Sequence, residues 1–168
     1  NAKEYQKALK WHEKRVSMGD SEQEVFYSLL TIAKIYENLQ FDFETVVNSY
    51  TKAYLYRPSR AEPLYFLANY YIRQNNFLLS YLLVKTALLV PAPGDIIFVQ
   101  HDIYDSGLFL QCADCSYKLG KYDETISAYN KLIYQSNLAA DLKEKIAHNL
   151  PIVESLLQQK KLEPSYNY

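Results

Sequence analysis

The sequence has little glycine and almost no net charge. Only four of its 168 residues are glycine, too few to build phosphate-binding loops, and no Walker, G-x-G-x-x-G or G-x-S-x-G motif occurs. The formal net charge is −1, from 18 basic and 19 acidic residues, so the chain lacks the positive field typical of sequence-independent nucleic-acid binding. We therefore expect neither a nucleotide-dependent enzyme nor a nucleic-acid-binding protein.

The chain also lacks an apolar run long enough to span a membrane. Its most apolar stretch, residues 77–90, includes Ser80 and Lys85, and therefore predicts a core helix. No secretory signal pattern is present at the start. Because the sequence begins with Asn1 and its single methionine is Met18, we expect a fragment of a longer protein.

Three stretches of the sequence share one repeated register. In each, an apolar residue precedes a cluster centred on alanine, an aromatic follows, and a second small or apolar residue comes roughly twenty positions after the alanine. Such a helical hairpin cannot bury its apolar face alone, so neighbouring hairpins must stack, which leaves a surface free for a partner. The register occupies Leu29, Ile32, Ala33, Tyr36, Phe43, Tyr50 and Ala53; Leu64, Leu67, Ala68, Tyr71, Phe77, Val84 and Ala87; and Phe109, Cys112, Ala113, Ser116, Tyr122, Tyr129 and Leu132.

Two antiparallel helices pack closely only where small side chains face each other, and Ala33, Ala68 and Ala113 are the predicted contact points. The pattern resembles the tetratricopeptide repeat (TPR). The small residues, aromatic and terminal proline of that family correspond to Ala33, Ala53 and Pro58, and to Ala68, Phe77, Ala87 and Pro91. The third unit departs from it, with Ser116, Leu132 and no following proline. The resemblance implies an all-α fold of antiparallel helical hairpins, stacked as a right-handed α-solenoid of about eight to nine helices.

We expect a single helical-repeat domain over residues 1–162. The prolines at 91 and 93 and the longer spacing between the second and third units indicate an insertion. The expected parts are repeat units at about 24–58, 60–91 and 104–137, an inserted segment at 91–103, capping helices within 138–162, near 138–148 and 152–160, and a frayed tail at 163–168. The predicted helix caps are Asp42 and two capping boxes, Ser21 with Glu24 and Ser59 with Glu62.

Few side chains suggest catalysis. Cys112 and Cys115 form a C-x-x-C motif without a second cysteine pair or a preceding strand, so we interpret them as buried thiols, with redox or metal chemistry as the alternative. His101 with Asp102 and Asp105 could form a metal or general-base site, although such residues more often cap a helix. The three histidines form no H-x-x-x-H pair. We expect no catalytic residue, no metal site and no cofactor.

The resemblance to the TPR family implies that the first helix of each hairpin lines a concave, partner-binding face. Mixed charge with aromatic anchors on that face suits a protein or peptide partner. Four of its residues, Lys34, Asn38, Asn69 and Arg73, could converge on a carboxylate and resemble the clamp by which some TPR proteins hold chaperone C-termini; an ordinary solvated face is the alternative. The predicted partner-binding residues are Tyr27, Lys34, Asn38, Glu62, Tyr65, Asn69, Arg73, Asp114, Tyr117 and Lys118.

A second resemblance covers most of the chain. It is carried by Trp11 with Arg15, residues 21–24, the segment from Arg57 to Tyr65, and residues 91–93 with Ile96, Phe98 and Tyr104. These look like the helical region that follows the catalytic domain of certain family-2-type glycosyltransferases, which implies an accessory C-terminal module in a sugar-transfer context. The Asp-x-Asp motif of such enzymes is absent here. Segment 57–65 also has a structural explanation, in which its arginines pair with nearby acids; Arg60→Ala would then lower stability modestly.

Three functional hypotheses follow from the sequence. The first is a noncatalytic protein-interaction module that positions a partner or sugar acceptor beside a glycosyltransferase domain. The second is a stand-alone TPR adaptor that binds a peptide or protein C-terminus in its concave groove. The third is an enzyme or metal protein built around residues 91–105. Two unpaired thiols and the lack of a signal pattern predict a cytoplasmic location.

Overall fold

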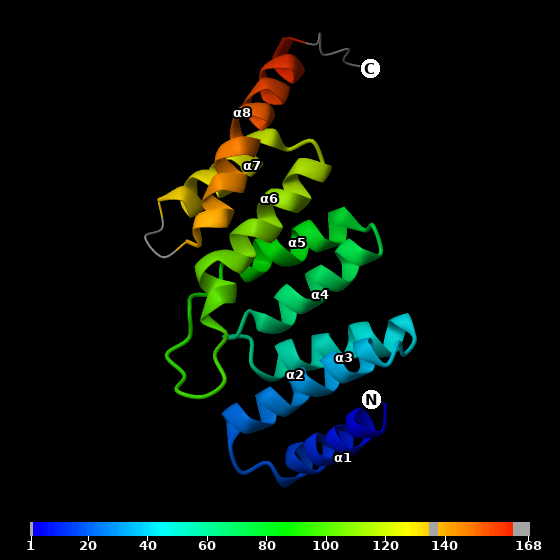
Figure 1. Cartoon of the computed structure of the whole chain (residues 1–168). Coiled ribbons are helices and arrows are strands. Elements are labelled where there is room, and N and C mark those ends of the chain that lie inside the picture. The colour runs from blue at the N-terminus through cyan, green and yellow to red at the C-terminus, as the bar shows by residue number, and fades with distance from the viewer. Residues whose placement is uncertain (1, 135–137, 163–168) are drawn as a thin grey trace.

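The computed structural model describes residues 2–134 and 138–162, and in these ranges the fold is entirely helical, without strands (Figure 1). The all-α expectation is therefore confirmed. Eight α-helices and one π-helical segment follow one another in the described part of the chain. They are α1 (Ala2–Met18), α2 (Glu22–Asn38), α3 (Phe43–Tyr56), α4 (Glu62–Arg73), α5 (Phe77–Ala87), η1 (Ile103–Gly107), α6 (Leu108–Lys118), α7 (Tyr122–Ile133) and α8 (Ala140–Leu162).

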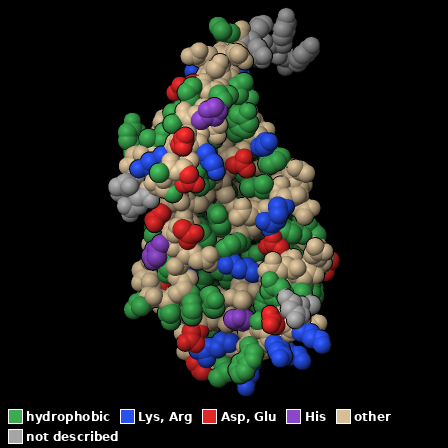
Figure 2. Space-filling model, in the orientation of Figure 1, with side chains coloured by type: hydrophobic (Ala, Val, Ile, Leu, Met, Phe, Trp, Pro, Cys, Tyr) green, Lys and Arg blue, Asp and Glu red, His purple; other side chains and the backbone are tan. Residues whose placement is uncertain are grey.

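Each α-helix packs against the next one in the sequence, and α4 also touches α6. Figure 1 shows the helices ordered along one long axis, with α1 at one end and α8 at the other. Lysine and arginine side chains gather over the α1 end, whereas acidic and basic side chains are interspersed over much of the remaining face in view (Figure 2). Sequential packing of this kind places the predicted partner-facing helices α2, α4 and α6 in one series.

The small residues of the repeated register lie at the helix contacts, as predicted. Ala33 and Ala68 are completely buried, and Ala113 is 1% exposed. Ala68 packs in one cluster with Val84 of α5 and with Cys112 and Ala113 of α6, so a single apolar layer joins the second and third units. A methyl group at these positions lets two helix backbones approach closely, which larger side chains would prevent.

Two helix caps follow the sequence predictions, and glycines end two other helices. Ser21 and Asp42 cap α2 and α3 by accepting hydrogen bonds from backbone N–H groups three residues later. The turns after α1 and α6 use Gly19 and Gly120 with φ of 72° and 66°, in the left-handed region where glycine lacks the steric penalty of a side chain.

Two predicted helix boundaries are wrong. Ser59 does not cap α4; the helix begins after Ala61 without a side-chain cap, and Glu62 is buried against Arg60 instead. The expected pair of C-terminal helices is one continuous helix, α8, with Pro151 inside it. Proline removes one helical hydrogen bond, yet Ile146 before it and Val153 after it are both buried, so both halves of α8 pack against the rest of the fold.

The inserted segment contains no regular α-helix, and it leads into η1 rather than directly into a capped α-helix. Asp102 precedes η1 without a side-chain capping bond, so the capping role expected for it is wrong. Gly107 ends η1 beside Tyr65, where an added Cβ would come within 3.1 Å of the tyrosine ring. This close approach brings the start of α6 against α4. The expected tail at 163–168 lies outside the described residues.

Candidate functional site

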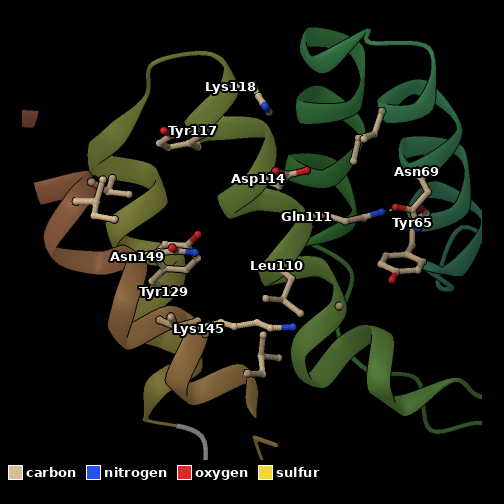
Figure 3. A pocket seen from close by; sticks show the side chains of 16 residues that line it. Tyr65, Asn69, Leu110, Gln111, Asp114, Tyr117, Lys118, Tyr129, Lys145 and Asn149 are labelled. Carbon is tan, nitrogen blue, oxygen red and sulfur yellow. Dashed lines mark hydrogen bonds between the residues drawn. The ribbon is translucent and has the colours of Figure 1, made fainter. Parts of the chain in front are cut away.

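A cleft of about 670 Å³ opens between α4, α6, α7 and α8. Part of the predicted partner-binding face lies in it: Tyr65 and Asn69 from α4, and Asp114, Tyr117 and Lys118 from α6. The close-up shows Gln111 extending from α6 toward Tyr65 and Asn69, with Asn149 and Lys145 of α8 on the other side of α6 (Figure 3). The remaining lining residues are Ile72, Gly107, Leu110, Tyr129, Leu142, Ile146, Ile152 and Val153.

The third wall of the cleft comes from α8, which the sequence predicted only as a cover for the end of the stack. Its apolar residues Leu142, Ile146, Ile152 and Val153 face the cleft in part, and Ile152 remains 48% exposed. Because α8 is not interrupted at Pro151, these residues form one aliphatic shelf along a single helix. A shelf of this kind can bury an apolar side chain of a ligand.

Aromatic and amide side chains occupy the rest of the wall. Burial raises the pKa of the Tyr129 phenol, and a hydrogen bond with Asn149 opposes part of this rise. The ring of Tyr117 packs 5.9 Å from that of Tyr122 and is 39% exposed. Tyrosines of this type offer large contact areas at low entropic cost and are common anchors at protein interfaces.

Gln111 was not among the residues predicted from the sequence. It is only 6% exposed, and its Nε2 donates a hydrogen bond to the backbone carbonyl of Tyr65 at 2.9 Å. Its Oε1 is buried and accepts no hydrogen bond from the described residues. The signal that could have found it is a carboxamide in an otherwise apolar helix face, between Leu108 and Cys112.

Charged groups at the cleft are not neutralised by one another. Among the described residues, Lys118 and Lys145 take part in no ion pair, and neither does Asp114. Lys118 lies 5.8 Å from the centre of the Phe77 ring. All three charged residues are exposed, so their hydrated charges remain free to meet opposite charges on a ligand.

The other predicted partner-binding residues lie outside the cleft. Tyr27 stacks on Phe98 of the inserted segment, with ring centres 4.0 Å apart. Lys34 sits 3.7 Å above the centre of the Phe66 ring, and partial burial lowers its pKa. Arg73 pairs with Glu37. Asn38 is exposed at the end of α2. None of these side chains lines the cleft that contains Asn69, so the carboxylate clamp expected from Lys34, Asn38, Asn69 and Arg73 stays a prediction.

Glu62 requires a correction, because it is completely buried and cannot face a partner. The Arg60 guanidinium, 1% exposed, donates to both oxygens of Glu62, to Asp95 at 2.7 Å and to the carbonyl of Phe98 at 2.9 Å. Arg57 also donates to Asp95, at 2.5 Å. This cluster confirms that the arginines of segment 57–65 pair with acids, and it fastens the inserted segment to the start of α4.

The catalytic candidates have ordinary structural surroundings. Cys112 and Cys115 are buried, as predicted, and burial raises the pKa of both thiols. Cys115 donates to Ser80 of α5 at 3.1 Å. His101 and Asp102 are exposed at the end of the insertion. Within residues 2–134 and 138–162, no group of three histidine, cysteine or carboxylate side chains is placed to hold a metal ion.

Comparison with known proteins identifies no family: no family model matches the chain, and no match is found among curated proteins. None of the helices in the described ranges combines the length and hydrophobicity needed to cross a membrane. Its function has to be inferred from the residues that enclose the cleft.

Proposed function

We propose that this chain is a noncatalytic, TPR-like interaction module that binds a protein or peptide segment in the cleft between α4, α6 and α8. The observation that carries this proposal is the cleft itself. It brings partner-facing residues predicted from two repeat units together with an aliphatic shelf on α8. Apolar anchoring sites, aromatic rings and unpaired charges in one concavity are typical of sites that recognise peptides.

The proposal includes a right-handed α-solenoid architecture. It is supported by packing between successive helices and by the buried alanines at equivalent positions of the repeat units. In such a stack, the first helices of successive hairpins share one face. Residues of α4 and α6 then contribute jointly to the cleft, which is what its lining shows.

The chemistry of the lining favours recognition over bond breaking. The cleft presents carboxamides, phenols and lysines, with Asp114 as its carboxylate. Asp114 is exposed, and the two thiols lie on buried parts of α6 away from the lining. A general base normally needs a neighbour that orients it, and among the described residues no ion-pair partner holds the Asp114 carboxylate.

Selection from a displayed library of short random peptides tests the proposal. We expect selected peptides to lose about tenfold or more in affinity on Tyr117→Ala, because truncating an interface aromatic typically costs more than 1 kcal/mol. Tyr134→Ala is the matched control, since Tyr134 is 87% exposed and lies outside the cleft. Equal effects of the two variants, or failure to select any binding peptide, would contradict a peptide site here.

We further propose that the module is an accessory C-terminal region of a glycosyltransferase and positions a partner or a sugar acceptor. Support comes from sequence segments that carry this resemblance, because segment 57–65 contacts Asp95 and Phe98 of the insertion and Tyr104 just after it. An Asp-x-Asp domain upstream in the parent protein would favour this role. The stand-alone adaptor would be favoured by tight binding of a free peptide C-terminus that depends on Lys34 and Arg73.

A further inference from the structure

We infer that the ligand of the cleft is a peptide main chain, which donates one N–H to Gln111 Oε1 and places an adjoining apolar side chain on the α8 shelf. This inference rests on the proposed function and names the chemistry of its ligand. It goes beyond general peptide binding because it assigns the central contact to a residue of α6 that faces both α4 and the cleft.

The starting observation is an unfulfilled hydrogen bond. Gln111 is held by its Nε2, which donates to the carbonyl of Tyr65, while its Oε1 is buried with no donor among the described residues. Buried amide oxygens nearly always have a partner, and an exception calls for an explanation. Because Gln111 also lines the cleft, a ligand is a natural source of the missing donor.

The geometry allows the carboxamide to reach a ligand. The terminal torsion of glutamine has a broad energy profile, so the amide plane can turn without leaving its rotamer. A turn that aims Oε1 into the cleft weakens the hydrogen bond that Nε2 donates to the Tyr65 carbonyl. That carbonyl lies inside α4 and accepts the helical bond from the N–H of Asn69 in any case.

The surroundings of Gln111 favour a peptide over a carbohydrate. Leu110 lies beside it on α6, and Leu142, Ile146 and Val153 line the same cleft from α8. A peptide offers an N–H donor next to an apolar side chain, which matches one acceptor beside an aliphatic shelf. A sugar exposes hydroxyl groups on most of its edge, and these would lose water against the shelf without gaining partners.

The charged residues at the rim of the cleft indicate the charge of the expected ligand. Lys118 on α6 and Lys145 on α8 both line the cleft and have no ion-pair partner among the described residues. They outnumber the single lining carboxylate, Asp114. We expect the bound segment to carry an acidic residue near its apolar anchor, because opposite charges at an interface rim raise the association rate and fix the orientation.

An ester scan of a selected peptide tests the main-chain contact. Each backbone N–H in turn is replaced by an ester oxygen, which removes the donor and keeps the side chain. Binding is measured on the unmodified chain and on Gln111→Leu. We expect one ester to weaken binding to the unmodified chain about tenfold, because it removes one hydrogen bond to a buried group. The same ester should have no further effect on Gln111→Leu, because the two changes remove one shared interaction.

Gln74→Leu is the matched control variant, because Gln74 is exposed at the end of α4 and lies outside the cleft. The ester effect should be unchanged on that variant. An ester effect that is equally large on Gln111→Leu would overturn the inference while leaving peptide binding in the cleft intact. Cleft-dependent binding of an oligosaccharide but of no peptide would overturn both the inference and the proposed function. The scan on the unmodified chain remains decisive even where Gln111→Leu folds poorly, since absence of any sensitive N–H refutes the contact.

Discussion

Replacing Arg60 with methionine measures what the buried ion cluster contributes to stability. The guanidinium is 1% exposed and donates to Glu62, Asp95 and the carbonyl of Phe98. Methionine fills a similar space but donates nothing, so among the described residues Glu62 keeps only the hydrogen bond from the Tyr104 hydroxyl at 2.6 Å. Removing one partner of a buried ion pair typically costs about 3–5 kcal/mol, because the other charge is left without compensation.

This cost is a large part of the total stability expected for one domain, about 5–15 kcal/mol. The sequence alone predicted only a modest loss at Arg60, because neither its burial nor its bond to Asp95 could be foreseen. The double variant Arg60→Met with Glu62→Leu should recover much of the loss, since an apolar pair of similar volume often replaces a buried ion pair without penalty. The two substitutions should therefore be strongly non-additive.

Urea denaturation followed by circular dichroism measures the effect, with an unchanged m-value as the check that the variants unfold in the same way. Arg73→Met is the control, because Arg73 pairs with Glu37 through a side chain that is 55% exposed. Surface pairs contribute about 0–1 kcal/mol. The reasoning is refuted if Arg60→Met loses no more stability than Arg73→Met, or if the double variant is as unstable as the single one.

Three further predictions concern packing, thiol reactivity and pH. Ala68→Leu should lower the free energy of unfolding, measured in urea, by about 1–3 kcal/mol, because it overpacks a completely buried site. Ala92→Leu, in the exposed insertion, should change this free energy little. Cys115 should react with Ellman's reagent far more slowly in the native chain than in urea. Burial raises the pKa of its thiol and also keeps the reagent away from the sulfur. Equal rates in the two conditions would contradict this prediction. Burial alone would raise the pKa of Glu124, but hydrogen bonds, chiefly from Tyr81, outweigh burial and lower this pKa. Glu124 therefore stabilises the fold at pH values above the ordinary pKa of glutamate, and this stabilisation is lost as the pH falls through the lowered pKa. Tyr81→Phe should reduce this acid dependence in thermal melts, and an unchanged profile would argue against the contact.

The repeated elements could be predicted because they depend on local chemistry and regular spacing. Ala33 and Ala68 recur at equivalent positions, and only small side chains fit where the helices meet. Asp42 caps its helix through a bond to a residue three positions away, and Gly120 adopts a backbone conformation that other residues avoid. The cap and the turn are specified by residues only a few positions away, and the alanines recur at a regular spacing.

The remaining features depend on contacts between distant segments. Glu62 was expected at a helix cap and on a binding face, but Arg60 and Tyr104 draw it into the interior, and Tyr104 lies 42 residues away. The continuity of α8 through Pro151 depends on burial on both sides of the proline. Gln111 lines the cleft because α4 and α8 lie on opposite sides of α6 (Figure 3). The sequence near Gln111 does not predict this arrangement of distant helices.

The anchoring of the inserted segment leaves its tip available for chemical labelling. Asp95 and the carbonyl of Phe98 hold the segment, while the side chain of Ile96 between them is 95% exposed. The natural thiols, Cys112 and Cys115, are 5% and 0% exposed. A cysteine introduced at Ile96 would therefore be the preferred target of a maleimide dye, and one fluorophore on a fixed loop would give a distance reference for energy-transfer measurements to a labelled peptide in the cleft.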